Sequence, residues 1–414
     1  MTTLQAPEQP RTPQQVRHPP HRHHHVPVRW FFWLVALSVV LVAGVHLAGG
    51  WYVAGRIGSG ALASTPAQPM PAFDDVRIVK VTRTSVQLRR GPDAGDSFTG
   101  AATYGLAWEG GTGLVGPAKV NKDGTVTRSF RVLQGTAPFA RQPAALDRNV
   151  WMGDPPQAFP LAKMDVTVGR LPAWYFPAGP GAVGTVAIYV HGQNGSRNNA
   201  LRFVNAAVPA GTPVLAITYR GDVGAPNEPS GRLQYGQTEW KDLEAAVDWA
   251  QQQGARNVVL VGESMGGAIV ASFLEKSTRR TMVSGIILDS PMLSLSAAVE
   301  NGARHGLPGG RAVPASVLWA AEKMAAHRYD LDWKAVDYLD DTSWLRIRAL
   351  VVHGSDDTVV PLSVSQRLKR AHPELVRLEV FPGAQHTEAW NTDAKRYTTD
   401  VRQYLRLATP KPGS

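Results

Sequence analysis

Hydrophobic positions follow three successive patterns along the chain, and the first is a single long apolar run. From Trp30 to Tyr52 the sequence WFFWLVALSVVLVAGVHLAGGWY carries no formal charge apart from a titratable His46. About 20 apolar residues are needed to cross the hydrocarbon core of a bilayer as a helix. Aromatic residues stand at both ends of the run, where membrane interfaces favour them. The pattern predicts a transmembrane anchor over residues 30–53.

Basic side chains predict how this anchor is oriented. Arg11, Arg17, Arg22 and Arg29 precede the run, and only Arg56 follows it closely. Positive charges favour the cytoplasmic side, so we expect residues 1–29 inside and the rest of the chain outside the cell membrane.

The tail and the end of the apolar run carry two further expectations. Residues 1–29 are rich in Pro, Gln, Arg and His without an apolar pattern, which predicts a disordered tail. We assign no metal to its histidines. The alternative to an anchor is a secretory signal cleaved near Ala61-Leu62-Ala63, but the apolar run is longer than such signals usually are. Either alternative exports the body of the chain.

The second pattern consists of short alternating runs between turn signals. Residues 54–72 contain Gly, Ser, Ala and Pro without periodicity and predict a flexible linker. Residues 73–164 hold alternating or β-branched runs such as VRIVKVTRTSVQL, which predict a β-rich subdomain. Two roles for this subdomain remain open, covering an edge of a larger sheet or helping to form a substrate groove, and we take the structural role as the working assumption.

The third pattern, over residues 165–408, alternates apolar strands with helical stretches. It predicts an α/β domain with a doubly wound, mostly parallel sheet. The expected strands lie near 165–169, 173–177, 185–190, 213–219, 257–261, 283–289, 348–353 and 376–381. The expected helices lie at 197–209, 237–253, 265–277, 361–371 and 393–407. A partly helical excursion over about 291–345 occupies the place of a lid, and residues 409–414 form a tail.

Composition and charge exclude several classes of site. The 414 residues include no cysteine, so disulfides, thiolate catalysis and cysteine metal sites are absent. The net charge is +10, but Lys and Arg form no run of the kind that binds nucleic acid, so we expect no nucleic-acid partner. The oligomeric state cannot be read from these features.

The strongest chemical signal is the sequence Gly262-Glu263-Ser264-Met265-Gly266-Gly267. An apolar strand precedes it and a helix of small residues follows, which is the context of a nucleophile elbow. The sharp turn exposes the hydroxyl of Ser264, and glycines at 262 and 266 remove side chains that would clash there. We expect Ser264 to be a catalytic nucleophile.

A serine nucleophile needs a base and a carboxylate that orients the base. Downstream, the strand-turn segment ALVVHGSDDTVVP carries Asp356 and Asp357, and the segment FPGAQHTEAWN places His386 after a further strand. The order Ser, Asp, His fits this arrangement. His386 is the expected base, and the acid is one of the two adjacent aspartates, with Asp289 as a reserve.

These residues resemble the α/β-hydrolase superfamily, in particular its membrane-anchored bacterial serine hydrolases of the esterase, lipase and peptidase kind. The resemblance covers roughly residues 165–408. The family's motif His-Gly-x-x-Asp-x-x-Val-Pro maps onto His353, Gly354, Asp357, Val360 and Pro361. The resemblance therefore implies Asp357, rather than Asp356, as the acid.

The same resemblance implies an oxyanion hole. The segment His191-Gly192-Gln193-Asn194-Gly195 follows a core strand and resembles the family's oxyanion loop. The implied donors are the backbone N–H groups of Gln193 and Met265. His191 is expected to be structural, and the following loop Tyr219–Asp222 is left outside the catalytic set.

The expected function is hydrolysis of an ester or related acyl bond in a small-molecule or lipid-like substrate, without a cofactor or a metal. Thioesterase and peptidase activity use the same machinery, and the fold does not decide among them. A non-catalytic binding protein that keeps the hydrolase fold is the alternative from another class.

Overall fold

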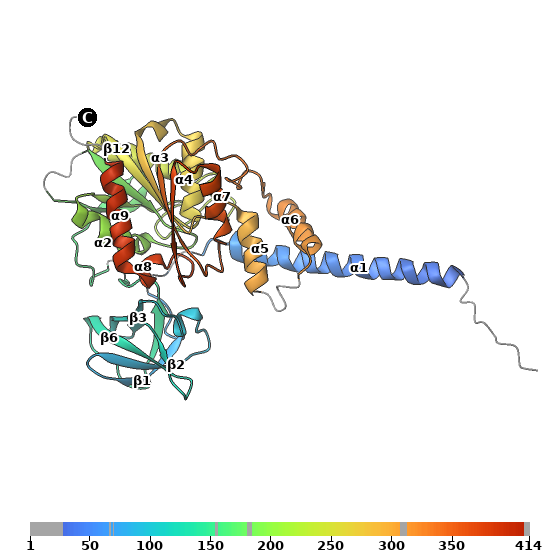
Figure 1. The fold of residues 1–414 in the computed structure, drawn as a ribbon, viewed down its shortest axis with the longest axis horizontal. Helices are drawn as coiled ribbons and strands as arrows, with labels where there is room; N and C mark the ends of the chain where they lie inside the picture. Colours follow the sequence, from blue (N-terminus) through green and yellow to red (C-terminus); the bar gives the residue numbers. More distant parts are fainter. Residues whose placement is uncertain are drawn as a thin grey trace, which may run out of the picture. The chain divides into compact units, whose positions relative to one another are not determined.

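The computed structural model describes residues 28–65, 68, 70–153, 156–179, 184–306 and 313–409, and it divides into two compact units, 1–48 and 49–414 (Figure 1). The expected disordered tail lies outside the described residues up to position 27. The expected C-terminal tail lies outside them from position 410.

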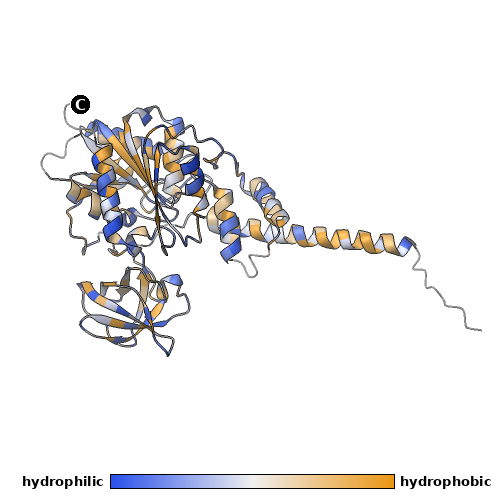
Figure 2. Cartoon of the chain, in the orientation of Figure 1, coloured by the Kyte–Doolittle hydropathy of each residue, from blue (hydrophilic) through white to orange (hydrophobic). Residues whose placement is uncertain are grey.

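Helix α1 spans Val28–Arg56 and is hydrophobic along most of its length (Figure 2). Residues 29–61, including the π-helical turn η1 at Ile57–Ala61, are long and apolar enough to cross a membrane by length and composition. The most apolar window of this segment has a mean hydropathy of 2.3. The helix follows from the uncharged sequence between Trp30 and Gly55.

The prediction of a flexible linker over residues 54–72 is wrong for the first part of this segment. The chain remains helical to Ala61, and Ala54, Ile57 and Leu62 are buried in the core of the larger unit. Leu233 N–H donates to the carbonyl of Leu62 at 3.1 Å. Two large apolar side chains in a segment of small residues are enough to bind it to the core, because their burial is favourable.

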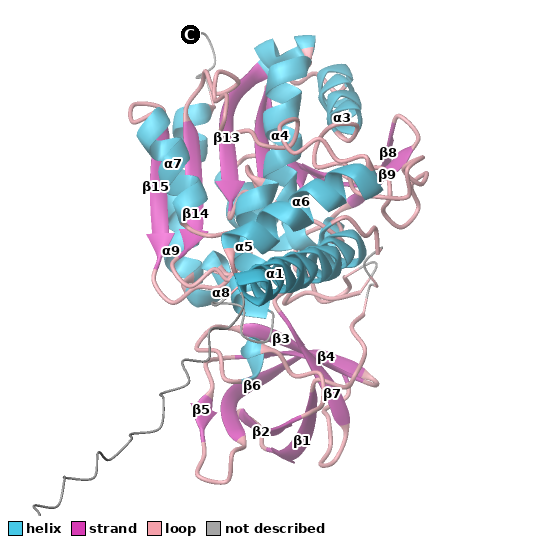
Figure 3. Ribbon diagram, turned by 90° about the vertical axis from the view of Figure 1, so that its right-hand side faces the viewer, coloured by secondary structure: helices cyan, strands magenta, loops and turns pink. Residues whose placement is uncertain are grey.

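The β-rich subdomain is a seven-stranded antiparallel sheet (Figure 3). Its strands are β1 Val76–Val81, β2 Ser85–Arg90, β3 Tyr104–Trp108, β4 Gly111–Val115, β5 Lys119–Val120, β6 Val126–Gly135 and β7 Pro143–Asp147. The order β2-β1-β7-β3-β4-β6-β5, with a further pairing of β2 and β6, closes the sheet into a barrel-like form. Alternate side chains such as Ile78, Val86 and Phe130 fill its interior.

The second sheet has eight strands in the order β15-β14-β13-β12-β10-β11-β9-β8. Their bounds are β8 Met164–Val168, β9 Leu171–Phe176, β10 Thr185–Val190, β11 Val214–Ala216, β12 Asn257–Glu263, β13 Val283–Asp289, β14 Ala349–Gly354 and β15 Val376–Phe381. The pairs from β11 to β15 are parallel, while β8 and β9 are antiparallel. The parallel strands are almost continuously apolar because helices cover both of their faces.

Helices α2 Leu201–Ala207 and α9 Ala394–Ala408 pack on one face of this sheet, while α3 Trp240–Gln252, α4 Met265–Lys276 and α7 Ser363–Ala371 pack on the other (Figure 1). The sheet is therefore doubly wound, as the sequence predicts. The excursion after β13 forms α5 Leu295–Gly306 and α6 Ala315–Tyr329, and residues 307–312 lie outside the described part. The switch in strand order between β10 and β12 marks the edge where ligands bind in such sheets.

Candidate active site

Ser264 stands on a strained turn between β12 and α4. Its backbone has φ 51° and ψ −117°, a conformation that costs energy for a residue with a side chain. The turn is tight: a Cβ on Gly262 would lie 2.7 Å from the carbonyl oxygen of Gly266. A Cβ on Gly266 would lie 2.1 Å from the carbonyl oxygen of Val190. Only glycine fits at these two positions, which accounts for the spacing seen in the sequence.

Three side chains from separate strand ends meet at this turn. His386 Nε2 lies 2.8 Å from Ser264 Oγ, and His386 Nδ1 lies 2.7 Å from Asp357 Oδ2. An ionised carboxylate only accepts hydrogen bonds. The Nδ1 atom of His386 therefore carries a hydrogen and donates a hydrogen bond to Asp357. Nε2 is then free to accept the hydrogen of the serine hydroxyl. The structure thus brings together the three residues that the sequence predicts for the triad.

Asp357 is held as an anion by several donors. Its Oδ1 accepts hydrogen bonds from the backbone N–H groups of Val359 and Val360 at 2.9 and 2.8 Å. His353 Nε2 lies 3.3 Å from Asp357 Oδ2, beside the bond from His386. Burial would raise the pKa of Asp357, but the hydrogen bonds from His353 and His386 lower it well below its usual range. The carboxylate is therefore ionised and fixed in orientation.

The two reserve aspartates lie in other surroundings. Asp356 is exposed and accepts a hydrogen bond from Ser355 Oγ at 2.7 Å. Asp289 is buried at the end of β13, where burial raises the pKa of its carboxyl group to about 7. Its backbone carbonyl accepts the N–H of Ser264 at 2.9 Å, while its Oδ1 has no hydrogen-bond partner among the described residues. Of the three aspartates, Asp357 is the one hydrogen-bonded to His386.

The loop after β10 packs directly against the serine. A Cβ on Gly192 would lie 2.9 Å from Cβ of Ser264, so only glycine permits this approach. Gln193 follows immediately. Met265 is the first residue of α4, and a first helical N–H has no acceptor within its own helix. Of the two expected oxyanion positions, Met265 directly follows Ser264 in the chain, and Gln193 directly follows the glycine that packs against Ser264.

His191 is fully buried and its ring nitrogens are occupied. Its Nε2 lies 2.9 Å from Asp222 Oδ2, and its ring stacks on Tyr219 with centroids 4.5 Å apart. Burial alone would lower the pKa of His191, but Asp222 raises it above its usual value. Arg220 in the same loop forms an ion pair with Asp242 at 2.8 Å. These contacts hold the loop and do not reach Ser264, in agreement with a structural role.

The region that holds this site matches a known protein family. The sequence model of the alpha/beta hydrolase family matches residues 187–399, about half of the chain. The chain belongs to this family. The match contains Ser264, Asp357 and His386 and leaves out the β-rich subdomain and α1.

Several relatives share this alpha/beta hydrolase region. An uncharacterized protein of Mycobacterium tuberculosis is 28% identical over 239 residues, which is 57% of this chain and 75% of the relative. The uncharacterized protein YfhR of Escherichia coli is 25% identical over 229 residues, covering 54% and 71%. The lysophosphatidylserine lipase ABHD12 of Xenopus tropicalis is 25% identical over 202 residues, covering 44% and 45%. Among solved structures, the Pyrococcus furiosus esterase Pf2001 is 19% identical, with a TM-score of 0.47 and coverage of 61% and 94%.

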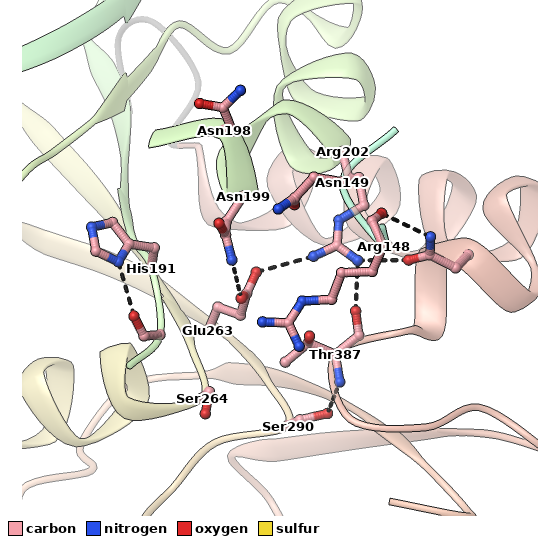
Figure 4. A network of polar contacts seen from close by, with 12 residues as sticks. Arg148, Asn149, His191, Asn198, Asn199, Arg202, Glu263, Ser264, Ser290 and Thr387 are labelled. Atoms are coloured by element: carbon pink, nitrogen blue, oxygen red, sulfur yellow. Dashed lines mark hydrogen bonds and ion pairs between the residues drawn. The ribbon is translucent and has the colours of Figure 1, made fainter. Parts of the chain in front are cut away.

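The hydrolase site rests on a buried polar network that the sequence did not reveal (Figure 4). Glu263, next to Ser264, is fully buried and accepts hydrogen bonds from Tyr189 at 2.5 Å, Asn199 at 2.7 Å and Arg202 at 3.2 Å. Burial would raise the pKa of Glu263, but Arg202 lowers it, so the carboxylate is ionised. A carboxylate at the end of an apolar strand was the one signal in the sequence for this network.

The network reaches the loop that carries His386. Arg202 donates to the carbonyl of Thr387 at 2.7 Å, and Ser290 Oγ accepts the N–H of Thr387 at 3.1 Å (Figure 4). Thr387 has φ 58°, which is unfavourable for a β-branched residue and persists only where its surroundings enforce it. Both backbone groups of Thr387 are thus clamped. The network links the serine turn to the histidine loop.

The β-rich subdomain contacts the same loop. Asn391 Nδ2 donates to the carbonyls of Thr103 and Arg148 at 2.7 and 2.9 Å, and Tyr104 donates to Glu388 at 2.8 Å. A polar cavity of about 480 Å³ between the subdomain and the hydrolase domain includes His386 in its lining. The sequence left two roles for the subdomain open, covering a sheet edge or helping to form a substrate groove. These contacts favour a role in forming the groove.

The described ranges offer no clustered set of metal-ligating side chains. No group of three or more His, Cys, Asp or Glu residues is placed there to hold a metal ion. The histidines of the N-terminal tail lie outside those ranges.

Proposed function

We propose that this protein is a membrane-anchored serine hydrolase that cleaves an ester or related acyl bond. Ser264 is the nucleophile, His386 the general base and acid, and Asp357 the carboxylate that orients His386. The backbone N–H groups of Gln193 and Met265 stabilise the oxyanion. The proposal requires no cofactor.

One observation carries the proposal. The hydrogen-bonded chain from Ser264 Oγ to His386 Nε2 at 2.8 Å and from His386 Nδ1 to Asp357 at 2.7 Å ends on a serine in a strained turn. A buried serine that only packs in a turn needs neither this backbone strain nor a histidine held by an ionised carboxylate. Strain of this kind is typical of a site where the hydroxyl must be presented to a substrate.

The acylation step uses each of these groups once. Ser264 Oγ attacks the substrate carbonyl while His386 Nε2 takes its proton, and Asp357 stabilises the imidazolium that results. The carbonyl oxygen becomes an oxyanion that accepts the N–H groups of Gln193 and Met265, each worth on the order of 3 kcal/mol. His386 then gives its proton to the leaving alcohol, and the acyl group stays on Ser264.

Deacylation reverses the roles with water. A water molecule loses a proton to His386 and attacks the acyl carbon, again through an oxyanion held by the same N–H groups. Collapse of this intermediate breaks the bond to Ser264 Oγ, which regains its proton from His386. The products are a carboxylic acid and the free enzyme.

A lipid-like substrate is supported by the apolar helix next to the domain. A helix that crosses the membrane would keep the site close to a lipid surface. The similar frog protein is called a lysophosphatidylserine lipase. We therefore propose acyl esters of lipid-like molecules as the substrate class.

A fluorophosphonate probe tests the proposed activity. The full chain in detergent should be labelled, and Ser264→Ala should abolish the labelling. Ser230→Ala, an exposed serine far from the turn in sequence, is the matched control and should be labelled like the wild type. A folded wild-type chain that resists the probe would favour the non-catalytic binding protein.

The proposed location is the cell membrane, with the N-terminus in the cytoplasm and the hydrolase domain outside. Protease added to intact cells should digest the domain while an intact N-terminal fragment stays with the membrane. A soluble form that begins near Ser64 would instead indicate a cleaved signal.

A further inference from the structure

The segment that follows helix α1 is bound to the loop expected to stabilise the oxyanion. We call residues Ile57–Thr65 the exit segment. Gln193 Nε2 donates to the carbonyl of Gly60 at 2.8 Å, and Asn194 Nδ2 donates to the carbonyl of Ala63 at 3.2 Å. The N–H of Thr65 donates back to Asn194 Oδ1 at 2.7 Å. Two consecutive side chains of the oxyanion loop are thus tied to the exit segment.

A tyrosine completes these contacts. The hydroxyl of Tyr235 donates to the carbonyl of Ala61 at 2.5 Å and lies 3.3 Å from Gln193 Oε1. Both ends of the Gln193 amide therefore have a partner. Asn194 has φ 50°, a left-handed conformation that asparagine adopts readily, and its side-chain amide is held by the exit segment. The exit segment supplies these contacts from more than 120 residues away in the sequence.

The exit segment also forms one wall of an apolar pocket of about 260 Å³. Its wall residues from this end of the chain are Val53, Ile57 and Ala61, and α5 lies opposite with Leu295, Ala298 and Val299. Among the described residues that line the pocket, Arg56 carries the one formal charge. The lining suits a hydrocarbon chain.

Two of the residues that line the pocket are connected to the serine turn. These residues are Gln193 and Met292. The N–H of Met292 donates to the carbonyl of Ser264 at 2.9 Å, and Gly192 packs against the side chain of Ser264. The serine turn and the apolar pocket therefore share Met292 and the loop that carries Gln193.

We propose that the exit segment is a working part of the active site: it holds the oxyanion loop through Gln193 and Asn194, and it walls a pocket that takes the acyl chain of the substrate. This inference rests on the proposed function. It assigns a role in catalysis to the end of the helix that would otherwise serve only as an anchor. Gln193 and Asn194 are positioning residues through their side chains.

The pocket is tested by filling it from Gly302 on α5. A Cβ at this position meets no atom within 4 Å, so Gly302→Trp adds bulk to the lining without a clash at the backbone. In full-length protein, kcat/KM for long-chain p-nitrophenyl esters should fall at least about 10-fold, since several methylenes lose their apolar site. Hydrolysis of the acetate ester should remain.

Matched variants on the same helix control for bulk and for helix stability. Glu300→Trp places the same side chain about 200° around the helix, at an exposed position outside the pocket, and should leave the chain-length profile unchanged. Gly302→Ala adds only a methyl group at the same position and should lower the rate for long esters much less than Gly302→Trp does. Equal losses for short and long esters in Gly302→Trp, or no loss at all, would overturn the pocket.

The hold on the oxyanion loop is tested at Asn194. Asn194→Gly removes both bonds to the exit segment, and glycine keeps the positive φ without strain. We expect kcat to fall about 10- to 100-fold for short and long esters alike, with KM little changed, because the oxyanion donor is misplaced. Asn194→Asp keeps the bond from Thr65 and should fall in between. An unchanged kcat in Asn194→Gly would refute the hold.

A measurement without catalysis separates this inference from the proposed function. A diazirine-bearing palmitate is photo-crosslinked to full-length Ser264→Ala, and the adducts are mapped by mass spectrometry. Adducts on Leu295–Val299 that disappear with Gly302→Trp support the pocket even if the wild type hydrolyses no ester. Adducts confined to residues 30–52 overturn it.

Discussion

Asp356 and Asp357 are adjacent and carry the same carboxyl group, but their surroundings give the two groups different hydrogen-bond partners. Asp357 accepts bonds from two backbone N–H groups and from His386, whereas the carboxylate of Asp356 bonds to Ser355 at the surface. Asp357 is the carboxylate that reaches His386, so the proposed orienting role belongs to it. This difference can be measured with isosteric substitutions.

Asp357→Asn should lower kcat by about 10⁴-fold, because the amide favours the wrong tautomer of His386. Asp356→Asn should change kcat by less than about threefold, as expected for an exposed group remote from the reacting atoms. Steady-state hydrolysis of a p-nitrophenyl ester compares the two. A larger loss in Asp356→Asn would reverse the assignment.

Asp289 predicts a dependence of stability on pH. Burial raises the pKa of its carboxyl group from 3.8 to about 7, so the folded state binds this proton more tightly than the unfolded state. Its contribution to the free energy of unfolding therefore falls as pH rises from about 4 to 7, by up to about 1.4 kcal/mol per pH unit. Asp289→Asn should lose that part of the slope in urea unfolding at pH 4.5, 5.5 and 6.5. An identical slope in variant and wild type would contradict the prediction.

At the scale of elements, the pair Arg202 and Glu263 joins α2 to the end of β12. The ions are 3.2 Å apart and almost fully buried, and Arg202 also holds the carbonyl of Thr387. The attraction between two buried ions adds little net stability. Removing one partner, however, leaves the other charge buried without compensation, which is strongly destabilising. The pair couples the packing of a helix to the position of the histidine loop.

Glu263→Gln should lower the free energy of unfolding by about 3 kcal/mol, because Arg202 is left as an uncompensated buried charge. Adding Arg202→Met should recover part of that loss. Asn199→Ala alone removes one donor to Glu263 and the acceptor of the Ser196 N–H, and should cost about 1 to 2 kcal/mol. Urea denaturation of the full chain measures all three. A double variant less stable than Glu263→Gln would argue against the pair.

The strands of the α/β domain could be predicted because buried parallel strands read as continuous apolar runs, as in VAIYV and NVVLV. The serine turn could be predicted because its glycines have one steric purpose. The expected helix 237–253 matches α3 closely, whereas the expected strand 213–219 is reduced to β11 at Val214–Ala216.

Contacts between distant segments could not be predicted. Arg202 meets Glu263 across 61 residues and Thr387 across 185, and no local pattern encodes such pairings. His353 was assigned to a motif, but its approach to Asp357 follows from the path of the loop between them. The linker was mispredicted because two apolar side chains, Ile57 and Leu62, are buried in the core and hold a segment that otherwise consists of small residues.

At the scale of the whole molecule, the strand order places the catalytic groups unequally. Ser264 follows β12, which has a strand on either side, whereas His386 follows β15 at the sheet edge. Edge strands open more readily than central ones. Backbone amides of β15 should therefore exchange hydrogen for deuterium faster than those of β12 in the native protein. Mild warming should then lower the proposed activity reversibly before the chain unfolds, because the loop that carries His386 follows the strand expected to open first, while Ser264 stays in place.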